Sequence, residues 1–358
     1  MNSSVFNPDM LILARESRGI TQTELAERVG VTQGKISKFE SGMLAVSTEE
    51  AARIARSLDY PSSFFYQPDK LAGCGSICDY YRKRKSLPHM ELKRLQARAN
   101  LMRLYTKALL YRAELDTPLK FHRMDIADYE AGSTQIAQLL RNSWNVAMGP
   151  VRNLIGTIED AGGIVFKMDF GTPQIDAISN WPKGMPPLFY VNASNPPDRM
   201  RFTLCHEIGH LVMHYVPTND MEGEADRFAA EFLMPAAEIS SQLHELTLPK
   251  LAALKEYWRV SMAALIRRAH DLGRIDDRRY RNLFTEMSRR GYRLQEPGEV
   301  PAEEPTVFRE LIQIHRSYHG YSVAELCILL HTKERYFLSD CLGETQSHAD
   351  PPHMRLAN

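Results

Sequence analysis

Residues 198–214 have the sequence DRMRFTLCHEIGHLVMH. Apolar residues recur at helical spacing around the two histidines, which predicts an amphipathic helix. His206 and His210 are four positions apart, so both imidazoles project from one helix face and can reach one metal ion. Glu207 lies beside them, where it can take a proton from an activated water and return it to a leaving amine. This His-Glu-x-x-His pattern predicts a zinc peptidase site, with Zn²⁺ as the cofactor.

A third ligand is expected on the following helix, whose sequence EGEADRFAAEFLMP begins twelve residues later. Glu222 and Asp226 are four positions apart and share a helix face. We predict that Glu222 binds zinc and that Asp226 orients His206 through a hydrogen bond, an arrangement similar to that of thermolysin-like peptidases. Glu224 and His214 stay open as alternative ligands.

The two motifs together resemble those of the ImmA/IrrE family of metallopeptidases. That family carries Arg-x-Arg-Phe-Thr-x-x-His-Glu-x-Gly-His followed by Glu-x-x-Ala-Asn/Asp-x-Phe-Ala-Ala-x-x-Leu-Met-Pro, and the resemblance runs over about residues 133–290. Cys205 stands where alanine is usual. The resemblance implies a peptidase that cleaves a helix-turn-helix repressor after a stress signal, with single-stranded DNA or a change in free metal as proposed triggers.

The N-terminal segment 22–39, QTELAERVGVTQGKISKF, has the pattern of a helix-turn-helix. Ala26 is small where two helices must cross closely, and Gly30 can adopt the left-handed conformation of a sharp turn. Thr32 is a suitable N-cap for the second helix. The segment resembles phage-repressor-like (Xre/Cro-type) domains over about residues 8–66. The predicted DNA contacts are Gln22, Gln33, Lys35, Ser37 and Lys38.

Charge is distributed unevenly along the chain, although the formal net charge is zero. Residues 1–70 contain 8 Lys/Arg and 9 Asp/Glu, so the helix-turn-helix has no basic excess of its own. Residues 82–123 contain 12 Lys/Arg and only three acidic residues. We therefore expect DNA affinity to depend on homodimer formation or on this basic segment. The alternative is a solvated helix face.

Composition indicates a soluble multidomain protein. The chain has 358 residues, 44% of them hydrophobic and 25% charged. No stretch approaches the roughly 20 apolar residues of a membrane span, and the N-terminus lacks a secretory pattern. Five scattered cysteines are typical of a reducing compartment. We expect a cytoplasmic protein with no membrane partner.

The expected fold class is multidomain. It comprises an all-α helix-turn-helix domain, an α+β zincin-like metallopeptidase domain and a helical C-terminal region. Apolar runs at 164–166 and 188–191 predict two strands of the middle domain. The expected boundaries are 1–70 for the helix-turn-helix, 71–132 for a basic linker and long helix, 133–245 for the peptidase, 246–296 for its helical continuation and 297–358 for a C-terminal helical unit.

The C-terminal unit shows a weak sequence similarity to the N-terminal helix-turn-helix. Ser322, Leu326 and Cys327 have the spacing of Thr21, Leu25 and Ala26, but His331 stands at the position of the turn glycine. A helical docking or dimer element is therefore favoured over a second DNA-binding unit.

These features together suggest a stress-responsive transcriptional regulator that binds DNA and cleaves a repressor or itself. One alternative is a DNA-binding repressor or antitoxin whose peptidase domain serves only as a metal- or ligand-sensing module. Another is a peptidase whose helix-turn-helix recruits only protein substrates. Glu207 and the three plausible ligands oppose the first alternative, whereas the acidic balance of residues 1–70 favours the second.

Overall fold

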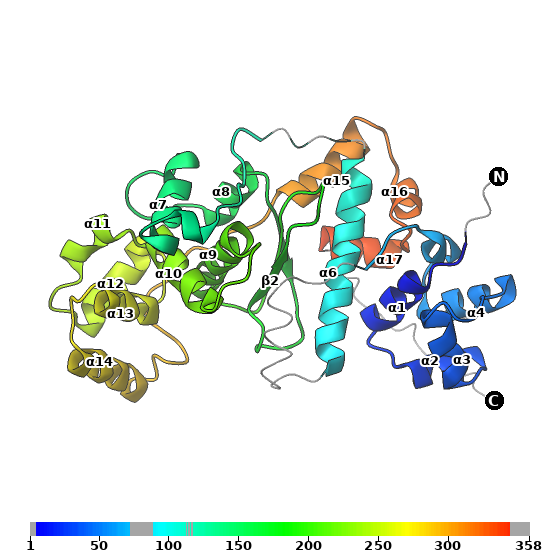
Figure 1. Cartoon of the computed structure of the whole chain (residues 1–358), viewed down its shortest axis with the longest axis horizontal. Coiled ribbons are helices and arrows are strands. Elements are labelled where there is room, and N and C mark those ends of the chain that lie inside the picture. The colour runs from blue at the N-terminus through cyan, green and yellow to red at the C-terminus, as the bar shows by residue number, and fades with distance from the viewer. Residues whose placement is uncertain (1–4, 72–88, 112, 114, 116, 344–358) are drawn as a thin grey trace, which may run out of the picture. The chain divides into compact units, whose positions relative to one another are not determined.

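The computed structural model describes residues 5–71, 89–111, 113, 115 and 117–343. The chain forms two compact units (Figure 1). Of the described residues, the first unit comprises 5–71, 97–111, 113 and 308–343, and the second unit comprises 89–96, 115 and 117–307. The expected fold class is confirmed: the N-terminal region is helical, the middle region mixes helices with a small sheet, and the C-terminal region is helical.

The N-terminal part of the first unit is a bundle of short helices. Thr21 accepts a hydrogen bond from the amide of Glu24, whose carboxylate accepts one from the Thr21 amide, and this reciprocal cap fixes the start of α2. Gly30 ends α2 at φ 73°, the left-handed conformation that a glycine adopts without strain. Thr32 caps α3 as predicted. The elements are α1 (Pro8–Ser17), α2 (Gln22–Val29), α3 (Gln33–Glu40), α4 (Thr48–Leu58) and η1 (Ser62–Tyr66).

The C-terminal helices belong to the first unit and contact its N-terminal bundle. Asp59, at the end of α4, forms ion pairs with Lys333 at 2.5 Å and with Arg335. His331 Nδ1 lies 2.9 Å from the Ser63 hydroxyl. The C-terminal region thus packs against the N-terminal bundle within the first unit. The other elements of the unit are α6 (His89–Leu110, from Ala97 onward), α15 (Val307–Ser317, from Phe308 onward), α16 (Val323–Leu329), α17 (Glu334–Tyr336) and η4 (Phe337–Leu342).

The C-terminal region reproduces only part of the helix-turn-helix pattern. Ser322 and Glu325 form the same reciprocal cap as at the start of α2, and His331 adopts a left-handed φ of 48°. The helix that follows, α17, continues directly into the π-helical segment η4, so the helical stretch runs from Glu334 to Leu342. Its π-helical hydrogen bonding distinguishes it from α3, which is a regular α-helix.

The second unit contains a three-stranded mixed sheet in the order β1-β3-β2. The strands β1 (Ile164–Met168) and β3 (Leu188–Asn192) are the two predicted apolar runs, and they pair in parallel. Strand β2 (Ala177–Asn180) pairs antiparallel with β3 and was not predicted. Its four residues, AISN, are too few to show an alternating pattern.

The helices α7 to α14 lie on one side of this sheet in Figure 1, and their apolar faces form one continuous core with it. The helices α9 and α10, which carry the predicted zinc ligands, pack against each other, and α9 also contacts β2 and β3. The elements are η2 (Ile126–Asp128), α7 (Gly132–Ser143), α8 (Leu154–Asp160), α9 (Pro197–Met213), α10 (Met221–Leu233), α11 (Ala236–Ile239), η3 (Ser240–Gln242), α12 (Leu248–Trp258), α13 (Met262–Asp271) and α14 (Asp277–Arg289).

The segment 297–305, which is rich in proline and glutamate, is fixed to the second unit by hydrogen bonds. Glu303 forms a buried ion pair with Arg201 of α9, and its other carboxylate oxygen accepts a hydrogen bond from the Ile155 amide at 2.8 Å. Glu159 accepts hydrogen bonds from the amides of Thr306 and Val307. The segment lacks regular secondary structure because its prolines have no backbone N–H to donate to a helix or a strand ladder.

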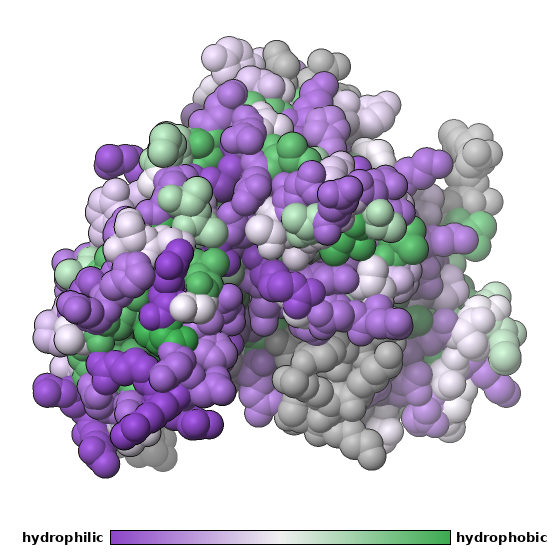
Figure 2. All heavy atoms as spheres, turned by 60° about the vertical axis from the view of Figure 1, so that its left-hand side comes forward, coloured by the Kyte–Doolittle hydropathy of each residue, from purple (hydrophilic) through white to green (hydrophobic). Residues whose placement is uncertain are grey.

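Among the described residues, none of the helices is long and apolar enough to cross a membrane. The surface visible in Figure 2 is largely hydrophilic, with hydrophobic side chains interspersed between hydrophilic ones.

Candidate metal centre and nucleic-acid interface

The close packing of two helices positions the candidate metal centre. Gly209 lies on α9 between the two histidines of the motif, facing α10. A Cβ at Gly209 would lie 3.2 Å from the Phe228 ring and 3.3 Å from the Cα of Ala225, so a larger residue would push the helices apart. This close approach brings the first turn of α10 to the histidines of α9.

The side chains of His206, His210 and Glu222 converge. The two Nε2 atoms are 2.9 Å apart, and each lies 3.5 Å from an oxygen of Glu222. Ligands of a tetrahedral zinc ion are expected at about 3.3 Å from one another, given bonds of roughly 2.0–2.1 Å. Two imidazoles and one carboxylate at these separations therefore fit zinc in the donor set that leaves one position open for water or substrate.

The pKa values of His206 and His210 are shifted in opposite directions. Burial lowers the pKa of His206, but hydrogen bonds to Asp226 and Glu222 outweigh it and raise that pKa to about 10. Burial, together with the nearby charge of His206, lowers the pKa of His210 to about 2. At neutral pH the pair therefore holds one proton more than two neutral rings do, and a cation bound by both Nε2 atoms must displace it.

Asp226 lies where the sequence places it, with Oδ1 2.8 Å from His206 Nδ1. The two alternative ligands lie elsewhere. Glu224 is outside the converging set, and its Oε2 is 2.9 Å from His214 Nε2. Both therefore contact the residues around the centre and not the centre itself.

Glu207 points to the sheet side of α9 and is almost fully buried, at 2% exposed. Burial raises the pKa of its carboxyl to about 7, although the charge of His206 and a hydrogen bond from Ser179 oppose the shift. The Ser179 hydroxyl, on strand β2, donates to Glu207 Oε2 at 2.6 Å. A carboxylate with a pKa near neutrality is suited to accept and return a proton. Sequence reasoning missed Ser179, because no motif marks it.

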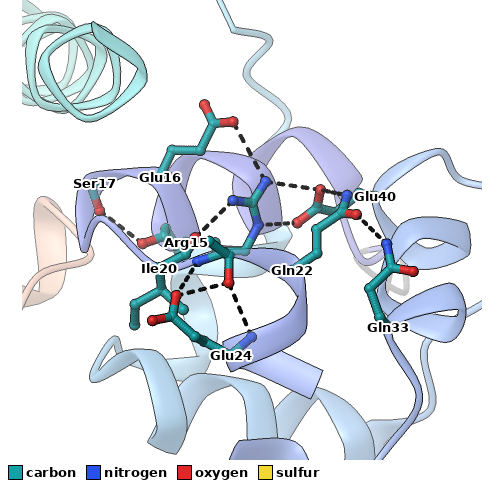
Figure 3. Close-up of polar contacts among 10 residues, drawn as sticks. Arg15, Glu16, Ser17, Ile20, Gln22, Glu24, Gln33 and Glu40 are labelled. Carbon is teal, nitrogen blue, oxygen red and sulfur yellow. Dashed lines mark hydrogen bonds and ion pairs between the residues drawn. The ribbon is translucent and has the colours of Figure 1, made fainter. Parts of the chain in front are cut away.

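Two of the predicted DNA-contacting side chains, Gln22 and Gln33, are joined to each other in the first unit (Figure 3). Arg15 forms a buried ion pair with Glu40 at 2.5 Å. The Gln22 amide donates to Glu40 Oε2 at 2.7 Å, and the Gln33 amide donates to Gln22 Oε1 at 2.7 Å. This chain of contacts holds the first residues of α2 and α3 together, with the Gln33 side chain at its exposed end.

The remaining predicted contacts are on α3 and differ in availability. Lys35 Nζ forms an ion pair with Glu50 of α4 at 2.5 Å, so it must leave that pair to contact DNA. Ser37 is partly buried and Lys38 is exposed. The most basic stretch of the chain, Arg82–Lys85, lies outside the described residues.

Comparison with known proteins supports both halves of this description. The model of the IrrE N-terminal-like domain matches residues 158–270, which include α9 and α10. The helix-turn-helix family model matches residues 11–65. The chain belongs to the Xre-type helix-turn-helix regulators fused to an IrrE-like peptidase domain.

One relative of this regulator family is an HTH-type transcriptional regulator of Methanothermobacter thermautotrophicus. It is 52% identical over 52 residues, which cover 14% of this chain and 75% of that protein. The similarity therefore covers only a short part of this chain. No comparison assigns a role to an individual residue, so the ligands, the base and the DNA contacts stay predictions.

Proposed function

We propose that this regulator binds promoter DNA through α3 and hydrolyses a peptide bond at the centre formed by α9 and α10. The carrying observation is the convergence of His206, His210 and Glu222 beside the buried carboxylate of Glu207. The DNA-binding half is supported by the helix-turn-helix match. Because DNA is the expected partner, we place the protein in the cytoplasm.

The residues of the centre divide the chemistry between them. His206, His210 and Glu222 would hold a zinc ion, which when bound polarises a water molecule and the substrate carbonyl. Glu207 would accept the proton of the attacking water and deliver it to the leaving amine. Ser179 orients the Glu207 carboxylate through its hydrogen bond.

The substrate of this peptidase is proposed to be a helix-turn-helix repressor or the chain itself, in response to a stress signal. The activity is proposed to be conditional on that signal. Single-stranded DNA is the proposed trigger, and a homodimer is the proposed DNA-binding form.

Mass spectrometry of the intact protein tests this function. The full chain, alone or with a helix-turn-helix repressor, is incubated with and without zinc and single-stranded DNA, and new termini are mapped. We expect new termini only when zinc is present. If zinc binds but no peptide bond is cut under any condition, the domain is a metal-sensing module.

A further inference from the structure

Glu224 and His214 lie beside a predicted zinc ligand without belonging to the ligand set. The Nδ1 atoms of His210 and His214 are 2.8 Å apart, and His214 Nε2 is 2.9 Å from Glu224 Oε2. The Thr218 hydroxyl donates to the same oxygen at 2.5 Å. Four side chains therefore form a continuous chain of hydrogen bonds from a predicted ligand to a carboxylate.

The direction of this chain follows from the chemistry of imidazole. A histidine that binds a cation through Nε2 keeps its one remaining proton on Nδ1, so His210 must be the donor to His214. His214 Nδ1 then accepts, which leaves the proton of His214 on Nε2, facing Glu224. Each donor meets an acceptor with both rings neutral, and one tautomer of each ring satisfies the whole chain.

The two histidine ligands are supported in different surroundings. The Asp226 side chain, which contacts His206 directly, is 54% exposed. The His214 side chain is completely buried and that of Glu224 is only 15% exposed. A hydrogen bond is stronger where water does not compete, and loss of a buried partner leaves a polar atom unsatisfied. Loss of the hydrogen-bond chain behind His210 is therefore expected to weaken zinc binding more than loss of Asp226.

Helix geometry explains how two nearby acidic residues take different roles. Glu222 and Glu224 are two positions apart on α10, about 200° around the helix axis. Glu222 faces the Nε2 atoms of His206 and His210. Glu224 reaches His214, which is one turn beyond His210 at the end of α9.

We propose that Glu224 and His214 are positioning residues that hold His210 in the tautomer and ring orientation that bind zinc. This inference rests on the proposed zinc site and adds a support that the motif does not contain. Groups that orient a ligand from behind typically change metal affinity by about 10–100-fold when removed.

Zinc affinity of the full-length protein, measured by competition with a chromophoric chelator, tests the proposal. His214→Phe keeps a ring but removes both nitrogens, and we expect the zinc Kd to rise about 10–100-fold. Glu224→Ala should weaken binding similarly, and Glu224→Gln, which keeps an acceptor oxygen, should weaken it less. The double variant His214→Phe/Glu224→Ala should bind no more weakly than His214→Phe, because Glu224 acts only through His214.

The controls separate this proposal from the function on which it rests. Asp220→Ala removes an exposed carboxylate that pairs with Arg227 just before α10, and it should leave zinc affinity unchanged. Circular dichroism and melting verify that each variant is folded. Wild-type affinity in the folded His214 and Glu224 variants, or additive losses in the double variant, would overturn the proposal while the zinc site stands. Absence of zinc binding by the wild type would remove both.

Discussion

The two units are assembled from the chain in different ways. In the second unit, the candidate site draws its three ligands and its base from α9 and α10, within 17 positions of sequence from His206 to Glu222. In the first unit, the predicted DNA contacts are equally local, from Gln22 to Lys38, but the N-terminal bundle is joined by part of α6 and by helices that lie more than 200 positions later in the chain. Both candidate sites are therefore visible as motifs, whereas the segments that complete the first unit are visible only in the fold.

The units also differ in what their polar side chains do in the absence of a partner. The predicted ligands of the second unit point at one another around a common centre. The predicted DNA contacts of the first unit are bonded to their own scaffold, as with Gln33 to Gln22 and Lys35 to Glu50. DNA binding therefore has to exchange internal contacts for external ones, which lowers the net gain from each.

The largest effect is expected at Glu207. Glu207→Gln keeps the side-chain size and a hydrogen-bond acceptor for Ser179 but removes the base. We expect cleavage to fall by about 10²–10⁴-fold, the usual contribution of general acid–base catalysis. Zinc content and promoter binding should match the wild type, because the ligands and the helix-turn-helix are untouched. A variant that still cleaves normally would show that hydrolysis uses another base.

The second-largest effect is expected at Glu222 and distinguishes a metal ligand from the acidic residues near it. Glu222→Ala removes a predicted ligand, and we expect zinc affinity to fall by more than the roughly 100-fold typical of supporting residues. Metal analysis after dialysis measures this directly, with Asp220→Ala as the matched acidic control. Because His206 has a pKa of about 10, zinc binding near pH 7 should release about one proton and weaken as pH falls. Calorimetry in buffers of different ionisation enthalpy counts that proton.

A smaller effect is expected for DNA recognition by α3. Replacing Gln33 and Lys35 together by alanine should weaken specific binding, with each good base contact contributing about 1–3 kcal/mol. Gel-shift titrations over a range of salt concentrations measure the change. Equal affinity of the double variant and the wild type would exclude these two side chains from the groove. Lys35→Ala also leaves Glu50 without its cation, so melting of the free protein is the necessary control.

The smallest effect concerns the stability of the first unit at low pH. Hydrogen bonds from Lys35 and Ser47 lower the pKa of Glu50 to about 2, below its ordinary value of 4.5. The stabilisation is complete above pH 4.5 and is lost as pH falls toward 2. We expect about 1–2 kcal/mol, less than the shift alone implies because Lys35 is partly exposed. In Glu50→Gln this acid-sensitive part should be missing.

The distribution of tryptophan makes that measurement selective. All three tryptophans, Trp144, Trp181 and Trp258, are in the second unit, so their fluorescence reports only that unit. Hydrogen exchange at the amides of α2 to α4 follows the first unit. A pH dependence that appears in the tryptophan signal and not in these amides would place the acid sensitivity in the second unit, and would contradict the prediction for Glu50.

Short-range patterns were sufficient to predict helices α9 and α10 and the side chains that converge between them. Helix periodicity places His206 and His210 on one face, whereas Glu222 was expected from the similarity to thermolysin-like peptidases. Ser179 was not, because its contact with Glu207 depends on where a four-residue strand joins the sheet. The same limit applies to Glu303, whose partner Arg201 is 102 positions earlier and whose own segment looks like a linker.

The route of the chain between the units has a consequence for self-cleavage. The first unit is completed by residues 97–113 and 308–358, so its N-terminal helices are held by contacts such as those of Asp59 with Lys333 and Arg335. A single cut between Leu71 and Ala97 would divide the polypeptide but leave those contacts intact. The product would run as two bands on a denaturing gel and as one particle in gel filtration. Release of the helix-turn-helix would then be governed by dissociation of a nicked complex, with a rate set by noncovalent contacts and not by the hydrolysis itself.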